Sequence, residues 1–356
     1  MAIFSSIFGG KTSIGVDIGT TTIKAVELEK SKEAFKLKKY GILETYGHLE
    51  RLNNAIQTSS LKMLEKETAS LLKTLLREAK IKGSVANASL PSFLAFTTLL
   101  EMPDMPSADT QKAVGFQAAQ HIPIPVSEVV IDWLKVGERE DEQGVKKQQV
   151  LLISVPKDYI EKYRNIFKMA GLNLASMEVE SLSSARSLVR DNVSTMIIDV
   201  GDRSSSISIV DKGLLKYVAQ TDFAGISLTQ AISKGLNVSM RRAEVIKRQK
   251  GLLGAGGEQE LSTIMSPYLD AIIEEAKRVR SIYENDFGGS VERVRLSGGG
   301  ANLLGIEKYI FNEMGVETLK GNPFELVTYS SDVEPAISEA GPILAVAVGL
   351  AMRDLK

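Results

Sequence analysis

The feature that most constrains the fold is a short hairpin motif that occurs twice, half a chain apart. The first copy, IGVDIGTTTIKAVEL, is an apolar run ending in Asp17-Ile18-Gly19, followed by hydroxyl residues and a second strand-like run. The second copy, MIIDVGDRSSSISIV, repeats the Asp-x-Gly unit 182 residues later, at Asp199. The chain has 356 residues, which is long enough for two domains. We therefore expect a duplicated α/β domain, with the two hairpins facing each other across a cleft.

Strands and helices are expected around the two hairpins. Each hairpin is followed by a third strand, over about 35–46 and 214–223. Apolar residues at helical spacing predict helices over about 60–81, 108–121 and 267–285. Asp158 and Glu161 predict a capping box at the start of another helix, and Gly171 would end that helix. The alternation of strands and helices predicts α/β architecture in both halves.

The pattern changes between about residues 84 and 156. Two strand-like stretches, SVANASL and FLAFTTLLEMP, precede a helix, a strand with the only tryptophan, a charged turn, and the strand QQVLLISVP. We interpret this part as a β-β-α-β-β subdomain inserted into the first half. The predicted domains are residues 1–190 and 191–356, with a helical subdomain at about 225–290 in the second.

Composition excludes several classes of protein. Lys and Arg number 43 against 44 Asp and Glu, which argues against a dedicated nucleic-acid binder. There is no cysteine, and His48 and His121 are not paired at ligand spacing, so a bound metal should be a hard, oxygen-liganded ion such as magnesium. The apolar stretch Gly341–Met352 is shorter than the roughly 18 residues of a membrane span. We expect a cytoplasmic chain without a direct membrane span.

The chemistry of two facing Asp-x-Gly hairpins favours a nucleotide cleft. Glycine allows a ligand to approach the backbone closely, and successive N–H groups and hydroxyls form a cradle for phosphate oxygens. A carboxylate there repels phosphate unless a cation lies between them. Asp17 and Asp199 therefore make sense together as holders of a hydrated Mg²⁺ ion, through water. Either hairpin alone is better explained as an ordinary hairpin with a buried, capped aspartate, so the interpretation depends on the pair.

A third glycine-rich element agrees with this interpretation. A strand ends at Ser297, and Gly298, Gly299 and Gly300 precede a helix start. Three glycines let a purine or its ribose lie against bare backbone. Leu303 stands where the third glycine of G-x-G-x-x-G would be, which argues against a Rossmann dinucleotide site.

These motifs together resemble those of the actin, Hsp70 and sugar-kinase ATPase superfamily. The resemblance lies in the order of Asp17-x-Gly19-Thr20, a helix beginning at Glu180, Asp199-x-Gly201, Gly298-Gly299-Gly300 and a closing helix led by Gly341. The inserted subdomain is similar to that of the FtsA and PilM branch. The segments GGKTSIGVDIGTTTIKAVELEK, FQAAQHIPIPVSEVVIDW and VESLSSARSLV resemble the PilM family of type IV pilus assembly proteins, over essentially the whole chain.

The resemblance implies a role for each matching residue. Phosphate would be held in the first loop by Gly19, Thr20, Thr21 and Thr22, and in the second by Gly201 and Ser204. Asp17 and Asp199 would act on magnesium, and Asp199 would also lie near the attacking water. Glu180 matches the residue that positions water, although the nearby Glu178 is an alternative helix-start carboxylate. Glu244 and Lys247 would flank the ribose and purine, unless they form only a solvated helix pair.

The resemblance also implies a function. The implied protein is an actin-like scaffold in the type IV pilus assembly platform, with ATP and Mg²⁺ as cofactors. It would lie at the inner membrane through its partners, and it could self-associate. The partner would be the N-terminal cytoplasmic segment of a PilN-like inner-membrane protein, held in a groove of the first half. ATP would bias closure of the two halves, and so the groove. The residues leave open whether ATP is hydrolysed.

Two alternatives remain at this point. An FtsA-like cell-division protein would carry an amphipathic helix after the closing segment, whereas this sequence ends at Lys356. A sugar or metabolite kinase would need a carbohydrate pocket with a catalytic carboxylate in the first half, and no such group of residues stands out there.

Overall fold

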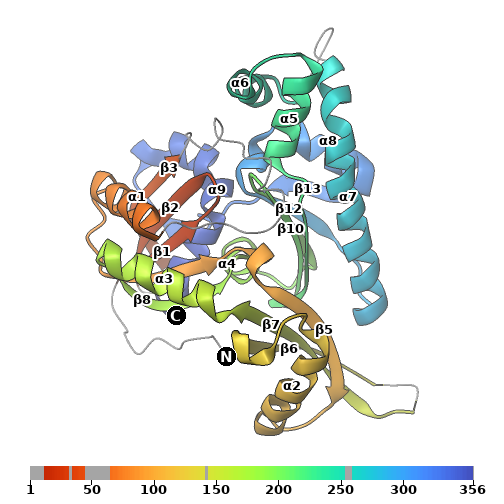
Figure 1. Ribbon diagram of the computed structural model, residues 1–356. Helices are drawn as coiled ribbons and strands as arrows, with labels where there is room; N and C mark the ends of the chain where they lie inside the picture. Colours follow the sequence, from red (N-terminus) through yellow and green to blue (C-terminus); the bar gives the residue numbers. More distant parts are fainter. Residues whose placement is uncertain (1–11, 32–33, 45–64, 141–142, 253–258, 356) are drawn as a thin grey trace.

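The computed structural model describes residues 12–31, 34–44, 65–140, 143–252 and 259–355. Two large sheets, each covered by helices, lie side by side, and a smaller unit extends below the second (Figure 1). The expected duplicated α/β architecture is therefore confirmed.

The first sheet has the strand order β14-β3-β2-β1-β4-β8. Its strands are β1 (Thr12–Ile18), β2 (Thr22–Ser31), β3 (Ala34–Glu44), β4 (Val85–Leu90), β8 (Asn173–Val179) and β14 (Val327–Thr328). β1 pairs antiparallel with β2, which places Asp17 opposite Lys24, and it pairs parallel with β4. The predicted hairpin is therefore present, and its second partner comes from a distant part of the chain.

The second sheet repeats this arrangement in the order β11-β10-β9-β12-β13. Its strands are β9 (Thr195–Val200), β10 (Ser205–Asp211), β11 (Leu214–Thr221), β12 (Arg293–Ser297) and β13 (Glu317–Lys320). β9 pairs antiparallel with β10 and parallel with β12, as β1 does with β2 and β4. The two sheets are thus built to one plan, which places their Asp-x-Gly turns at equivalent ends.

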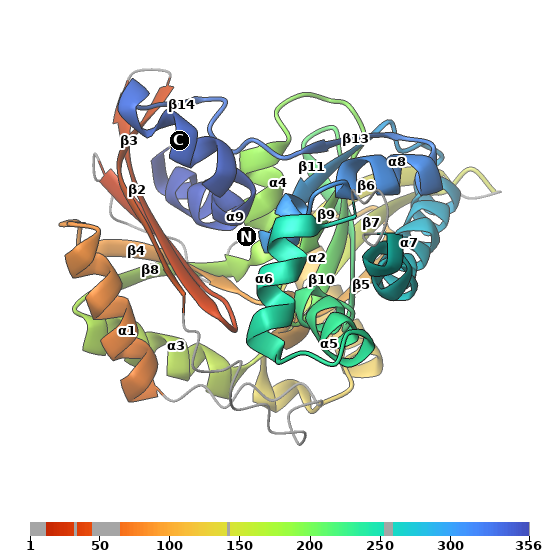
Figure 2. The same cartoon turned by 90° about the horizontal axis from the view of Figure 1, so that it is seen from above.

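Helices cover both faces of these sheets. The helices are α1 (Glu65–Glu78), α3 (Lys157–Ala170), α4 (Glu180–Leu188), α5 (Gly225–Gly235), α6 (Met240–Lys250), α7 (Gln259–Phe287), α8 (Ile306–Met314) and α9 (Glu334–Met352). On the first sheet, α1 and α3 cover one face and α9 covers the other. On the second, α5, α7 and α8 enclose the largest core. Figure 2 shows α4 and α9 between the two sheets.

Two details of the predicted helices are wrong. α3 begins at Lys157 directly after Pro156, and the Asp158 carboxylate pairs with Lys162 at 3.2 Å instead of capping the helix. Pro156 occupies the N-cap position, which places Asp158 inside the first turn, where its side chain cannot cap the helix. α7 begins before Pro267 rather than at it. The predicted stop at Gly171 is confirmed, with φ of 84°.

The inserted unit differs from its predicted composition. Its sheet has three strands in the order β5-β7-β6, namely β5 (Phe96–Pro103), β6 (Val129–Glu140) and β7 (Lys146–Pro156), with helix α2 (Ser107–His121). SVANASL is not its first strand, because β4 pairs with β1 and β8 in the first sheet. The side chains of β4 are buried on both faces, as a central parallel strand requires. The insertion is therefore β-α-β-β.

The C-terminal segment returns to the first sheet. β14 pairs with β3, and α9 packs on β1 and β2, although both follow the second sheet in sequence. The domain limits near residue 190 and the helical subdomain at 225–290 stay predictions. Within the described part of the chain, Ser331–Met352 is long and apolar enough to cross a membrane, but 72% of its most apolar window is buried inside the protein. This segment is longer than the stretch Gly341–Met352 considered above.

Close packing of α9 leads to a stability prediction. A Cβ atom at Gly349 would lie 1.9 Å from the Ser183 carbonyl oxygen of α4, which is backbone and cannot move aside cheaply. We expect Gly349→Ala to lower the free energy of unfolding by about 1–3 kcal/mol, in the range of overpacked cores. Gly115→Ala in α2 is the matched control, since no atom lies within 4 Å of its added Cβ. Urea unfolding measures both variants, and equal stabilities would contradict the prediction.

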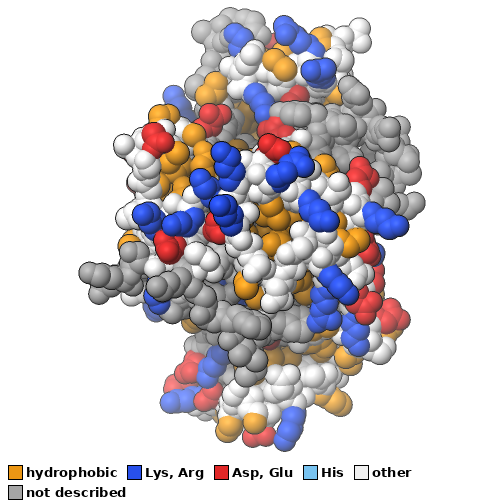
Figure 3. Space-filling model, turned by 90° about the vertical axis from the view of Figure 1, so that its left-hand side faces the viewer, with side chains coloured by type: hydrophobic (Ala, Val, Ile, Leu, Met, Phe, Trp, Pro, Cys, Tyr) orange, Lys and Arg blue, Asp and Glu red, His pale blue; other side chains and the backbone are white. Residues whose placement is uncertain are grey.

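Charge is mixed on the face shown in Figure 3. Lys and Arg side chains are scattered over it, with acidic and hydrophobic side chains between them. Lys36, Lys38 and Lys39 of β3 are exposed, and Lys38 pairs with Glu29.

Candidate functional site

The two Asp-x-Gly turns have the same local geometry. The Gly19 N–H donates to the Thr22 carbonyl at 2.9 Å, and the Gly201 N–H donates to the Ser204 carbonyl at 3.1 Å. In each turn this hydrogen bond therefore joins the glycine to the residue three positions later, directly after the strand that carries the carboxylate. The structure thus supports the sequence repeat at the level of single hydrogen bonds.

Asp17 lies at the end of β1 and is engaged on both oxygens. Its Oδ2 forms an ion pair with the Lys24 Nζ at 2.8 Å, and its Oδ1 accepts a hydrogen bond from the Ser89 hydroxyl at 2.7 Å. Only 5% of Asp17 is exposed. The sequence predicted a magnesium role for this carboxylate, and in the structure it is also the buried partner of a lysine. Its role toward magnesium stays a prediction.

Asp199 occupies the equivalent position at the end of β9. Its Oδ2 accepts a hydrogen bond from the Ser297 hydroxyl at 2.7 Å, and its Oδ1 faces Gly298. Burial raises the pKa of Asp199, the Ser297 hydroxyl and Lys24 lower it, and the charge of Asp17 raises it again. The charge of Asp17 is therefore close enough to influence the ionisation of Asp199.

Glu180, the first residue of α4, is the third carboxylate of the site, beside Asp17 and Asp199. Its Oε1 accepts a hydrogen bond from the Ser92 backbone N–H at 3.1 Å. Burial, followed by the charges of Asp199 and Asp17, raises the pKa of the Glu180 carboxyl to about 7. A group with this pKa can take up or release a proton near neutral pH.

Lys24 and Tyr163 share the same buried site. Burial lowers the pKa of Lys24, but Asp17, Asp199 and Glu180 outweigh burial and raise it overall. Burial and the charges of Asp17 and Glu180 raise the pKa of Tyr163, whose hydroxyl has no hydrogen-bond partner among the described residues. Asp17, Asp199 and Glu180, which come from both halves, thus lie within electrostatic reach of Lys24, and Tyr163 lies near Asp17 and Glu180 in the core of the first sheet.

The structure distinguishes Glu180 from its neighbour Glu178. The Glu178 carboxylate accepts hydrogen bonds from Arg186, Arg353 and the Ser183 hydroxyl. Burial alone would raise the pKa of Glu178, but these partners lower it. Glu178 is therefore a neutralised structural anchor for α4 and the C-terminal turn, whereas Glu180 faces the two hairpins.

Glu244 and Lys247 lie beside the second hairpin. Their side chains pair at 2.8 Å and are only 14% and 12% exposed, so they are not a solvated surface pair. The Lys247 ammonium also donates to the Gly225 carbonyl and the Thr229 hydroxyl. Although burial opposes ionisation, Lys247, Thr229 and Arg248 lower the pKa of Glu244 to about 2. Their predicted contact with ribose and purine stays a prediction.

The glycine run after β12 lies against the second hairpin. Gly298 has φ of 77°, and a Cβ there would lie 2.5 Å from the Val200 carbonyl oxygen. Gly299 has no atom within 4 Å of an added Cβ, so its backbone is open to a ligand. A Cβ at Gly300 would meet the Val200 side chain at 2.3 Å. The run therefore supplies both tight packing and a bare stretch of backbone.

Several residues of the site were missed from sequence. They are Lys24, Ser89, Tyr163, Asp202 and Ser297. Lys24 was detectable, because a tight hairpin turning at Gly19 places it opposite Asp17. Asp202, in the second turn, has a buried Oδ2 without a hydrogen-bond partner in the described part of the chain. The other three come from distant segments and gave no local signal.

Direct metal ligation is not prearranged in the structure. Within the residues that it describes, no three Asp, Glu or His side chains form a group that could hold a metal ion directly. The buried charge nonetheless suits a further cation, because the three carboxylates exceed the charge of Lys24. A hydrated ion, held through water, fits this arrangement better than a fully protein-ligated one.

The raised pKa of Glu180 predicts a pH-dependent stability. The ordinary pKa of 4.5 rises to about 7 on folding, so the folded state binds more protons between these values. Stability should therefore fall as pH rises through this window, by about 3 kcal/mol in total. We expect Glu180→Gln to remove most of this dependence in urea unfolding at pH 5, 6 and 7 without nucleotide. An unchanged pH slope in the variant would show that another group is responsible.

The fold and the two facing hairpins define an actin-like protein. MreB5 of Spiroplasma citri bound to AMPPNP superposes with a TM-score of 0.56 at 14% identity, covering 95% of this chain and 94% of MreB5. The PilM–PilN type IV pilus biogenesis complex gives a TM-score of 0.82 at 23% identity, covering 98% and 100%. At these identities the structural likeness shows the shared fold.

The family is shown by sequence. The family model of the type IV pilus assembly protein PilM matches residues 15–355, so the chain belongs to the PilM family. The cell division protein FtsA of Enterococcus faecalis is 21% identical over 378 aligned positions, covering 90% of this chain and 83% of FtsA. Membership in the PilM family favours the scaffold interpretation over that of a metabolite kinase.

Proposed function

We propose that this chain is an ATP-binding actin-like scaffold of the type IV pilus assembly platform. It acts at the cytoplasmic face of the inner membrane, where it holds the N-terminal segment of a PilN-like protein in a nucleotide-dependent way. The observation that carries the nucleotide assignment is the convergence of Asp17, Lys24, Glu180 and Asp199 between two equivalent turns. The solved relatives bound to AMPPNP and ADP support it, because they share the fold.

The two turns are assigned to the phosphates. Backbone N–H groups and hydroxyls of Gly19–Thr22 and Gly201–Ser204 are the anion cradle, with the Lys24 ammonium beneath the first turn. The open backbone at Gly299 and the pair Glu244 and Lys247 are assigned to the purine and ribose side. Phosphate charge would be balanced by Lys24 and by magnesium held through water at Asp17 and Asp199.

Glu180 is assigned to the water that would attack the terminal phosphate. Its carboxylate is fixed by the Ser92 N–H, and its raised pKa suits proton exchange near pH 7. When bound, magnesium supplies charge neutralisation for the phosphates. This arrangement is compatible with slow hydrolysis, for which Asp199 and Glu180 are the candidate catalytic residues.

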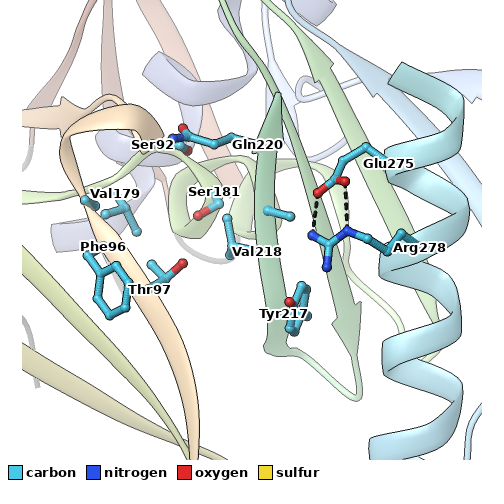
Figure 4. A pocket seen from close by; sticks show the side chains of 12 residues that line it. Ser92, Phe96, Thr97, Val179, Ser181, Tyr217, Val218, Gln220, Glu275 and Arg278 are labelled. Atoms are coloured by element: carbon cyan, nitrogen blue, oxygen red, sulfur yellow. Dashed lines mark hydrogen bonds and ion pairs between the residues drawn. The ribbon is translucent and has the colours of Figure 1, made fainter. Parts of the chain in front are cut away.

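A pocket of about 270 Å³ is our candidate for the partner groove. It lies between β5 of the insertion, β11 of the second sheet and α7 (Figure 4), and is therefore lined by both halves and not by the first alone. Among the described strands, β5 and β11 are edges of their sheets. Free edges can pair with an extended segment by strand addition, and walls that carry both polar and apolar side chains can take the alternate side chains of such a segment. We name it the β5–β11 pocket; its lining residues are Ser92, Ala95, Phe96, Thr97, Val179, Ser181, Tyr217, Val218, Ala219, Gln220, Glu275 and Arg278.

Capture of the partner segment tests the scaffold proposal. A synthetic peptide of the N-terminal segment of the PilN-like protein should bind the full chain in calorimetry, with an affinity that changes when Mg-ATP is present. Thr97→Trp, which fills the β5–β11 pocket, is expected to weaken peptide binding at least about tenfold by displacing its side chains. Phe116→Ala is the matched control, because Phe116 is 76% exposed on α2 and does not line the pocket. Absence of peptide binding to the unmodified chain would reject the scaffold proposal.

A further inference from the structure

One short segment touches both the carboxylate cluster and the β5–β11 pocket. This segment, residues 89–97, comprises the end of β4 in the first sheet, the turn after it and the start of β5 in the insertion. At its start the Ser89 hydroxyl donates to the Asp17 carboxylate at 2.7 Å. Three residues later the Ser92 N–H donates to the Glu180 carboxylate at 3.1 Å. We call it the β4–β5 segment.

The same segment forms one wall of the pocket. Ser92, Ala95, Phe96 and Thr97 line it. The facing wall includes Ser181, the residue directly after Glu180. The pocket and the cleft thus share two short stretches of backbone, one on each side of the Ser92–Glu180 hydrogen bond.

A polar group in this pocket lacks a partner. The Ser181 hydroxyl is buried, with 2% of the residue exposed, and has no hydrogen-bond partner among the described residues. Figure 4 shows the Ser181 and Thr97 side chains directed into the space between β5 and β11. An unsatisfied buried hydroxyl is costly, so a ligand that offers a backbone N–H or carbonyl would be favoured there. This position is where an extended polypeptide would present such groups.

We propose that the β4–β5 segment couples the two sites, so that a polypeptide segment seated in the β5–β11 pocket changes the affinity of the cleft for magnesium-nucleotide through the Ser92–Glu180 hydrogen bond. The inference rests on the nucleotide site of the proposed function. An occupant packed on Ala95, Phe96 and Thr97 fixes or displaces the segment, and Ser92 carries this change to Glu180. Coupling is reciprocal, so nucleotide changes the affinity of the pocket by the same factor.

Two variants at one position isolate the hydrogen bond. Ser92→Pro removes the N–H donor, and the backbone tolerates it, since Ser92 is the first residue of a 3₁₀ turn and Pro91 has a ψ of 142°. Ser92→Ala removes the hydroxyl and keeps the N–H. Comparison of the two therefore separates the backbone link from any effect of the side chain.

The pocket can be filled without the natural partner, because the chain contains no cysteine. Thr97→Cys labelled with N-benzylmaleimide places one apolar group in the pocket of the full chain. Gly115→Cys with the same label is the control, because Gly115 lies on α2 with no atom within 4 Å of its added Cβ. Circular dichroism checks that each labelled protein is folded.

The readout is the affinity for Mg-ATP measured by calorimetry. We expect the label at Thr97→Cys to change the dissociation constant at least about fivefold, within the usual range of coupling between sites, and the label at Gly115→Cys to leave it unchanged. The effect should persist with Ser92→Ala and vanish with Ser92→Pro. If Ser92→Pro does not fold, Glu180→Asp replaces it, since a side chain shorter by one methylene no longer reaches the Ser92 N–H.

Three results would overturn the coupling and leave the nucleotide site in place. The label could change the Mg-ATP affinity equally at both positions, or have no effect at Thr97→Cys. Its effect could also remain undiminished in a variant that lacks the Ser92–Glu180 hydrogen bond. Absence of Mg-ATP binding to the unlabelled chain overturns the proposed nucleotide site, and the coupling with it.

Discussion

Asp199→Ala is expected to weaken Mg-ATP binding by at least about 100-fold, equivalent to about 2.8 kcal/mol. The variant removes one of the two carboxylates that we assign to the hydrated cation, and it leaves the phosphates of the nucleotide without that support. Loss of the Asp199 charge should also lower the pKa of Glu180, which Asp199 helps to raise. Calorimetric titration with Mg-ATP measures the first effect, and the pH dependence of unfolding measures the second.

The fold should survive this change. The Ser297 hydroxyl, which donates to Asp199, also lies 3.2 Å from the Pro342 carbonyl and so keeps an acceptor. Asp158→Ala is the matched control, because Asp158 is an exposed carboxylate paired with Lys162 on α3, away from the two hairpins. Equal Mg-ATP affinities of the two variants would reject the cleft assignment.

Lys24→Met is expected to lower the free energy of unfolding by about 3–5 kcal/mol near pH 8. Lys24, with 14% of its side chain exposed, is the partner of the buried Asp17, and its removal leaves that buried charge without compensation. Asp199 and Glu180 add further negative charge near Lys24, so the loss of its ammonium should destabilise the fold more than it would beside a single carboxylate. Urea unfolding at constant pH measures the loss.

A double variant separates charge from packing. Lys24→Met combined with Asp17→Asn should recover most of the lost stability, because the neutral amide needs no cation. Lys38→Met is the control, since Lys38 of β3 pairs with Glu29 of β2 at 3.1 Å, and both side chains are largely accessible to solvent. This surface pair should contribute at most about 1 kcal/mol. No recovery in the double variant would mean that Lys24 stabilises the fold by packing alone.

The hairpins, and therefore the fold class, were predictable from sequence because their determinants are local. A turn at Gly19 or Gly201 and alternating flanking residues specify antiparallel pairing over a few residues. The helical stop at Gly171 belongs to the same category, since a left-handed residue ends a helix without help from distant contacts. The predicted capping box failed for a local reason as well, because Pro156 holds the N-cap position and Asp158 lies inside the first turn of α3.

The main error in the predicted fold was the assignment of a strand to the wrong sheet. The stretch SVANASL looked like the start of the insertion because it precedes another strand directly, yet β4 lies between β1 and β8. Sequence adjacency indicates the next strand in the chain, whereas sheet neighbours are chosen by which faces must be buried. The choice between Glu178 and Glu180 was open for a similar reason, since Arg353, which neutralises Glu178, lies 175 residues away.

By itself the sequence determined that two Asp-x-Gly turns exist, that they repeat at half a chain, and that no cysteine chemistry takes part. Only the tertiary structure decided that both turns meet around Lys24 and Glu180, and that the β4–β5 segment joins this cluster to a pocket. The physical reason is distance along the chain. Asp17 meets Ser89, Ser92 meets Glu180 and Asp199 meets Ser297 over separations of 72, 88 and 98 residues. Such contacts, and the shifts in ionisation that they cause, exist only once both sheets have formed and excluded water from the space between them.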